Sequence, residues 1–149
     1  MQLFNDYLIS PWYNYSMTMK RKVNYFLLCE EFTYDDLDRV TISRIFNSVS
    51  AAGYPVKPTK FTLAFSVYLN DKDLEKKTSD LKIALEDDKG GIGLVAETTT
   101  PIEKSKRTIV TMLDLSNEIS FPRKGSYKAR LYVNDEEVDQ LIFKVEDER

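Results

Sequence analysis

The chain has 149 residues, 42% of them apolar and 30% charged, and a formal net charge of −3. This balance is typical of one globular domain with a sizeable core, and the lack of a pervasive basic region argues against a nucleic-acid partner. The sequence has no histidine, which removes the commonest general base and metal ligand. Its single cysteine, Cys29, excludes an intrachain disulfide and a thiolate zinc site.

Residues 1–19 form an N-terminal aromatic segment, and a β-sandwich domain is expected over residues 20–149. The segment does not resemble a secretory signal, because Asn5, Asp6 and Pro11 interrupt its apolar residues and its basic residues come after it. No stretch approaches the ~20 apolar residues of a membrane helix. We therefore expect a cytoplasmic protein without a membrane partner, and one unpaired thiol suits a reducing compartment.

Alternation of apolar and polar residues predicts strands along the rest of the chain. It is cleanest over residues 61–69, which indicates a strand with one buried face. Turn residues separate the strands, notably at 88–91 and at Asn134-Asp135. Helical turns are expected only over 71–78 and 35–39. The predicted strands, in chain order, are 23–29, 40–49, 61–69, 81–85, 92–97, 108–115, 127–133 and 141–145.

About eight short strands without long helical periodicity predict an all-β fold, a two-sheet sandwich of mainly antiparallel strands. We expect it to be immunoglobulin-like in its C-terminal third, because residues 121–127 have the form of a tyrosine corner. In that motif Gly125 turns the chain between sheets and the Tyr127 hydroxyl bonds to an upstream backbone group. The alternative is that Tyr127 is simply a core aromatic residue.

Four segments of the chain resemble a family of uncharacterised bacterial proteins. They are residues 26–31, residues 40–47, Gly53-Tyr54-Pro55, and the tail from Phe121 to Val145. The resemblance covers roughly residues 22–146. Because the family is a domain of unknown function, the resemblance implies a small bacterial sandwich protein and no activity. In one departure, Arg44 stands where the family tends to carry glycine before the Ile-Phe pair.

Acidic residues gather in several predicted loops and suggest an alternative function. Loops at one end of a sandwich can hold Ca²⁺, which prefers six to eight oxygen ligands, and C2-like domains bind ligands or membranes in this way. Interleaved lysines and the lack of a known calcium-loop spacing favour solvated loops instead. The candidate ligands are Asp35, Asp36, Asp71, Asp73, Asp87 and Asp88. A facing carboxylate pair could also serve a hydrolase, which is the weakest hypothesis.

The remaining candidate sites have simpler interpretations. Cys29 shares a strand face with Val23, Tyr25 and Leu27, which is typical of an inert core thiol. The basic clusters at 20–22 and 104–107 lie at predicted strand ends, where solvated lysines are ordinary. We expect no catalytic residue, no cofactor and no small-molecule substrate.

The favoured function is therefore a non-enzymatic protein-interaction or self-assembly module. Two predicted strands, 23–29 and 108–115, are apolar on both faces, and soluble monomers seldom leave such patches open. We expect the N-terminal segment to cover an outer sheet face, its own or that of a symmetry mate, and the second case gives a dimer with exchanged arms. The alternative is that residues 1–18 are an extension without a role. The predicted interaction residues are Trp12, Tyr13, Tyr15, Phe26, Leu28, Val110 and Met112.

Overall fold

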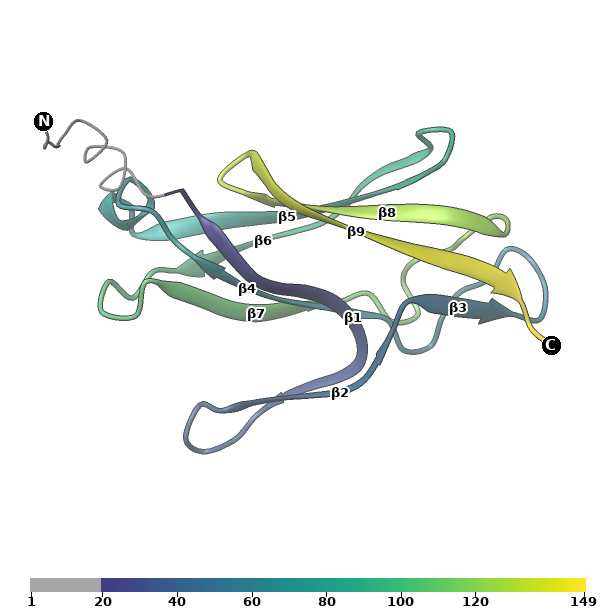
Figure 1. The fold of residues 1–149 in the computed structure, drawn as a ribbon, viewed down its shortest axis with the longest axis horizontal. Coiled ribbons are helices and arrows are strands. Elements are labelled where there is room, and N and C mark those ends of the chain that lie inside the picture. Colours follow the sequence, from purple (N-terminus) through teal and green to yellow (C-terminus); the bar gives the residue numbers. More distant parts are fainter. Residues whose placement is uncertain (1–19) are drawn as a thin grey trace, which may run out of the picture.

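The computed structural model describes residues 20–149, whose strands form two stacked sheets (Figure 1). One sheet has four strands in the order β2-β1-β4-β7, and the other has five in the order β3-β9-β8-β5-β6. The predicted all-β, two-sheet sandwich is confirmed. The strands are β1 (Lys22–Tyr34), β2 (Val40–Phe46), β3 (Ser48–Ala51), β4 (Thr62–Tyr68), β5 (Thr78–Asp87), β6 (Ile92–Pro101), β7 (Thr108–Asp114), β8 (Gly125–Val133) and β9 (Glu136–Asp147).

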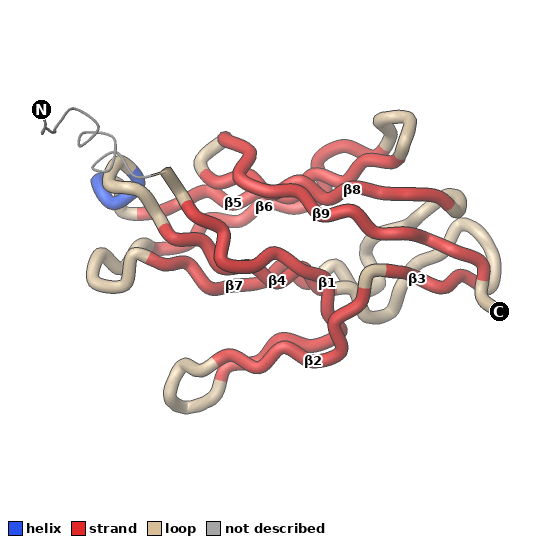
Figure 2. The backbone as a smooth tube through the Cα atoms, viewed as in Figure 1, coloured by secondary structure: helices blue, strands red, loops and turns tan. Residues whose placement is uncertain are grey.

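One short 3₁₀ helix, η1 (Asp73–Glu75), lies in the connection between β4 and β5 (Figure 2). It falls inside the predicted helical turn at 71–78. The region 35–39 is instead a hydrogen-bonded turn. Across the described residues, no helix has the length and apolar character needed to cross a bilayer.

The strand pairs are antiparallel, as predicted, with the exception of β3, which runs parallel to β9. The predicted strand 40–49 is in fact two strands in different sheets, because β2 pairs with β1 whereas β3 pairs with β9. The chain crosses between the sheets at Asn47, whose carbonyl accepts a hydrogen bond from the Lys144 amide at 3.0 Å. Alternation reports which side chains face a core and not which strand is the neighbour, so it could not reveal this crossing.

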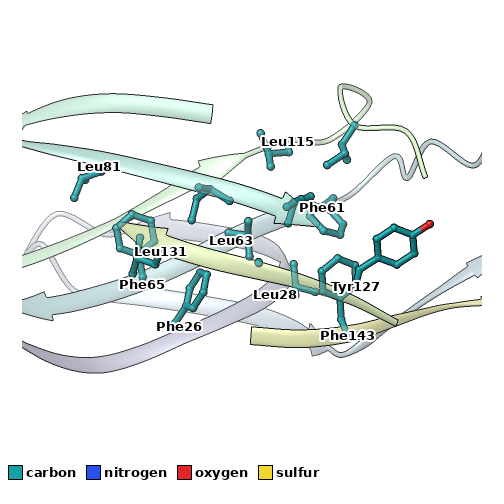
Figure 3. Close-up of a cluster of buried hydrophobic side chains, with 14 of the residues drawn as sticks. Phe26, Leu28, Phe61, Leu63, Phe65, Leu81, Leu115, Tyr127, Leu131 and Phe143 are labelled. Carbon is teal, nitrogen blue, oxygen red and sulfur yellow. The ribbon is translucent and has the colours of Figure 1, made fainter. Parts of the chain in front are cut away.

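The core lies between the two sheets and contains a cluster of aromatic rings at one end (Figure 3). Phe61, Phe121, Tyr127 and Phe143 lie with contacting ring centroids 4.9 to 5.9 Å apart. The inward side chains of β5 and β8 complete the core and are fully buried. They are Leu81, Ile83, Leu85, Ala129, Leu131 and Val133. Full burial of a large apolar side chain contributes ~1.5–3 kcal/mol, so the aromatic cluster and these inward side chains together are a main source of stability.

Strand β4 is buried on both faces, which corrects the prediction of a strand with one buried face. Leu63, Phe65 and Val67 point into the core and are 0% exposed. The side chains that alternate with them are small and point to the outer face of the four-stranded sheet. These are Thr62, Ala64 and Ser66, and each is at most 4% exposed. The outer face of this sheet therefore has a cover of its own.

The hairpin formed by β1 and β2 supplies that cover. β1 pairs with β4 as far as Cys29, and beyond that point its neighbour is β2. Figure 1 shows the second half of β1 turning back with β2 on the side of β4 and β7 that faces away from the five-stranded sheet. The Tyr34 hydroxyl donates a hydrogen bond of 2.7 Å to the Val110 carbonyl of β7 and fixes the hairpin there. We call residues 30–46 the covering hairpin.

Arg44 lies at the bend of the covering hairpin, opposite Glu30 in the β1–β2 register. Its backbone φ is +57°, in the left-handed region that costs a residue with a side chain ~1–2 kcal/mol. Glycine adopts this conformation without that cost, so the glycine that the family resemblance implies at this position would be unstrained. The departure at this position therefore leaves a strained residue in β2.

We expect Arg44→Gly to be more stable than Arg44→Ala by about 1 kcal/mol, because only glycine relieves the strain. The exposed ion pair from Arg44 to Glu30, at 3.6 Å, is lost in both variants and contributes little. Urea unfolding of the two variants measures the difference. If Arg44 had an ordinary extended backbone, the alanine variant would be the more stable of the two. That order would contradict the positive φ at Arg44.

The predicted tyrosine corner is confirmed at the start of β8. The Tyr127 hydroxyl donates to the carbonyl of Arg123 at 2.5 Å, four residues upstream, and the ring is 2% exposed. Gly125 between them has a φ of +149°. Figure 3 shows the hydroxyl at the margin of the aromatic cluster, where a polar tip can reach the backbone while the ring stays buried.

We expect Tyr127→Phe to lower the free energy of unfolding by about 1–3 kcal/mol, because the Arg123 carbonyl loses its donor. Tyr132→Phe is the matched control, since Tyr132 is a half-buried tyrosine of the same strand. Thermal and urea unfolding should separate the two variants. Equal stability of Tyr127→Phe and the control would show that the corner bond has no energetic role.

Candidate interaction surfaces

The six acidic residues proposed as calcium ligands do not come together. Asp35 accepts hydrogen bonds from the amides of Leu37 and Arg39 and closes the tip of the covering hairpin. Asp71 pairs with Arg107 at 2.6 Å, while Asp36 and Asp88 are exposed. Over residues 20–149, no three His, Cys, Asp or Glu side chains are placed to share a metal ion. The calcium alternative has no site geometry in this part of the chain.

Asp87 is a nearly buried carboxylate that serves the β5–β6 turn. Its oxygen accepts hydrogen bonds of 2.8 Å from the amides of Lys89 and Gly91, and Arg123 forms an ion pair with it. These two backbone amides, with help from Arg123, hold the pKa of Asp87 below its usual range. A carboxylate held ionised by donors from its own turn is a structural group rather than a general acid.

Asp73 joins the start of β1 to η1 and to the β8–β9 turn. Its oxygens accept two hydrogen bonds of 2.7 Å from Arg21 and one of 2.9 Å from Asn134. The two charged side chains are 2% and 10% exposed, and Arg21 also pairs with Glu136. Burial alone would raise the pKa of Asp73, but the hydrogen bonds from Arg21 and Asn134 outweigh it, so the pKa lies below its usual value. Three segments distant in sequence are thus held at one end of the sandwich.

We expect Asp73→Asn to cost about 3 kcal/mol of stability, because it leaves the Arg21 guanidinium buried with only Glu136 as an ionic partner. A depressed pKa stabilises the fold fully above the unfolded value of ~3.9 and loses that effect as the pH falls through the folded value. The advantage of the wild type over Asp73→Asn should therefore shrink on acidification. Urea unfolding across a pH series measures this.

Asp71→Asn is the control for Asp73→Asn, because Asp71 is an exposed acidic residue two positions away whose ion pair is solvated. Exposed pairs contribute at most ~1 kcal/mol, so this variant should remain close to the wild type. Equal costs for the two variants would contradict the structural role given to Asp73.

The predicted interaction residues lie in different parts of the molecule. Phe26 and Leu28 are 9% and 0% exposed and point into the core, so the prediction that they form an outer patch is wrong. Both faces of β1 are apolar, and the sequence alone could not show which one is inner. Val110 and Met112 are half-buried, on the strand face opposite to the buried Ile109. Trp12, Tyr13 and Tyr15 lie outside the described residues.

Cys29 is fully buried, as predicted for an inert thiol. It pairs with Thr62 in the β1–β4 register, and its strand face is the outer face that the covering hairpin meets. Burial, and to a lesser extent the nearby Asp114 carboxylate, raises the pKa of the thiol. A raised pKa disfavours the thiolate, which is the reactive form of a cysteine nucleophile.

A groove of about 560 Å³ lies between the covering hairpin and strands β6 and β7. Tyr34 and Val40 of the hairpin form one wall, and Ile102 and Val110 form part of the other. The hydroxyl of Tyr34 spans the groove to reach β7. The hairpin consequently overhangs β7, the edge strand of the four-stranded sheet.

Edge strands carry unpaired backbone groups, which attract other strands unless the edge is blocked. Three of the four edges in residues 20–149 are blocked in different ways. β3 has four residues, β2 is kinked at the positive φ of Arg44, and β7 lies beneath the covering hairpin. The fourth edge, β6, has ten residues and a single charged side chain, Glu97. It is the open edge of the described structure.

The second half of β6 is regular and polar, and Glu97 is its single charged side chain. A bulge opposite Ile83 and Ala84 and the positive φ of Gly93 disturb only its first half. From Ala96 to Thr100 the strand pairs with β5 residue for residue, and this stretch contains three consecutive threonines. The sequence predicted a strand at 92–97 but not that it was an edge. The charge-poor threonine run was the one available signal, since charges normally guard edges.

Comparison with known proteins places this sandwich in a family. The chain belongs to the DUF6941 family, a family of unknown function whose model matches residues 24–146. This confirms the resemblance to an uncharacterised domain family. No curated protein matches the chain. Among solved structures, one of a Bacillus anthracis protein assigned provisionally to the lipoproteins is 14% identical over 78% of this chain and 84% of that chain, with a TM-score of 0.31. A likeness at this TM-score carries no argument about this chain.

Proposed function

We propose that this chain is a non-enzymatic protein-interaction module that recruits an extended strand to the open edge of β6. The observation that carries the proposal is the contrast between β6 and the three blocked edges. A strand added to β6 would pair with its free amides and carbonyls, which is the mode of recognition known as β-augmentation. The partner is therefore a protein segment, and nucleic acid, membrane or a small substrate is not required.

The non-enzymatic part of the proposal is supported by the ionisable side chains, which are either bonded to other groups of the protein or buried. Asp73 and Asp87 are tied to arginines and to backbone amides, and the Cys29 thiol is buried with a raised pKa. A general acid or base needs a free proton-transfer position beside a substrate, and these groups do not have one. A cytoplasmic location accords with the lone thiol. For the last third of the chain we propose an immunoglobulin-like arrangement, which the tyrosine corner supports.

The chemistry of β6 specifies the kind of strand it would accept. Threonine favours extended backbone, and cross-strand threonine pairs are stabilising. Glu97 lies opposite Lys82 in the β5–β6 register, but the Lys82 ammonium pairs with Asp135, so the edge carries one negative charge among uncharged residues. We expect the bound strand to be uncharged opposite this stretch and rich in β-branched residues.

Hydrogen exchange with a capped peptide of alternating threonine and valine tests the proposal. With the peptide in excess and the protein dilute, amide exchange should slow over residues 95–100 of β6 and remain unchanged over β2 and β7. A peptide of the same length with proline at alternate positions is the control, since it lacks the amides that pair with an edge. Equal effects of the two peptides, or no slowing at β6, would contradict strand addition.

A further inference from the structure

We infer that the strand recruited by β6 is β6 of a second copy of this chain, paired antiparallel about Thr98. This inference rests on the proposed function and names its partner. Each copy contributes its five-stranded sheet, and the two sheets become continuous across the symmetry axis. A two-fold axis uses the same strand from both copies, so it closes both open edges at once.

The register follows from the positions of charge and proline along β6. With the axis at Thr98, Glu97 of one copy lies opposite Thr99 of the other, and Ala96 lies opposite Thr100. No carboxylate faces another carboxylate, and Thr98 faces its own copy. Like charges directly opposite each other are destabilising, whereas threonine pairs are favourable.

The two neighbouring registers are worse for identifiable reasons. An axis at Glu97 places two carboxylates opposite each other. An axis at Thr99 places Pro101, which has no amide to donate, opposite Glu97 and next to the centre of the ladder, whereas an axis at Thr98 places Pro101 opposite Val95, at the bulged end of the paired stretch. The sequence of β6 therefore selects Thr98 as the centre.

The other three edge strands, β7, β3 and β2, are not open to pairing with a second copy. The covering hairpin overhangs β7, and Tyr34 occupies the Val110 carbonyl. β3 is short, and β2 is kinked at Arg44. Among the described edge strands, β6 is therefore the one through which two copies can pair. Because one strand pair is a small interface, we expect a dimer that dissociates on dilution.

Charge variants at Thr98 test both the partner and the register. Thr98 is exposed, so Thr98→Lys and Thr98→Glu should fold like the wild type. In the proposed dimer each variant places two like charges face to face, and we expect its dimer dissociation constant to rise at least tenfold. An equal mixture of the two variants should recover dimers, because lysine then faces glutamate. Sedimentation velocity over a concentration series measures all of these states.

Thr41→Lys is the matched control, because Thr41 is an exposed threonine on the blocked edge strand β2. It should dimerise like the wild type. Dimers of both Thr98 variants as stable as the wild type would overturn the inference. A wild type that remains monomeric while the threonine-valine peptide still protects β6 would overturn the second-copy partner and leave strand recruitment standing. A monomer whose β6 the peptide does not protect would overturn both.

Discussion

The burial of β4 on both faces is the constraint on which the rest of this structure depends. A strand in a two-sheet sandwich normally has one face in the core and one in water. Here the outer column of β4 consists of Thr62, Ala64 and Ser66, and the strands on either side carry apolar outer residues such as Leu27 and Met112. The covering hairpin turns back over this face, and the same turn shields the edge of β7. One bend in β1 and β2 therefore buries a sheet face and closes a sheet edge, and it leaves β6 as the edge available to a partner.

Most of the sandwich could be predicted from the sequence, because alternation identifies half-buried strands directly. The tyrosine corner was also predictable, since it depends on residues close together in the chain. The division of 40–49 into two strands was not, because the crossing at Asn47 depends on which strands become neighbours. The same limit explains the error at Phe26 and Leu28. When both faces of a strand are apolar, only the folded chain decides which face is inner.

The candidate site shows where sequence reasoning about function ends. Acidic clusters suggested calcium, but in the structure Asp35 caps a turn, Asp71 pairs in solvent and Asp73 fixes three segments to one another. Such roles depend on partners distant in sequence, such as Arg21, which is 52 residues from Asp73. The open edge of β6 is a property of strand order as well, so its threonine run had no distinct meaning before the sheets were known. Charged side chains in the described residues mainly hold connecting segments together, and the charge-poor stretch of β6 is the one that we propose as the site of a partner.

The most direct test of the covering hairpin is the rate at which a thiol reagent labels Cys29, the single cysteine of the chain. Because Cys29 lies fully buried on the outer sheet face, native labelling should be slower than labelling in urea by roughly a hundredfold or more. Tyr34→Phe, which removes the hydrogen bond to Val110, should speed the native reaction by releasing the hairpin. Native labelling as fast as in urea, or a rate that Tyr34→Phe leaves unchanged, would contradict the hairpin as the cover of this face.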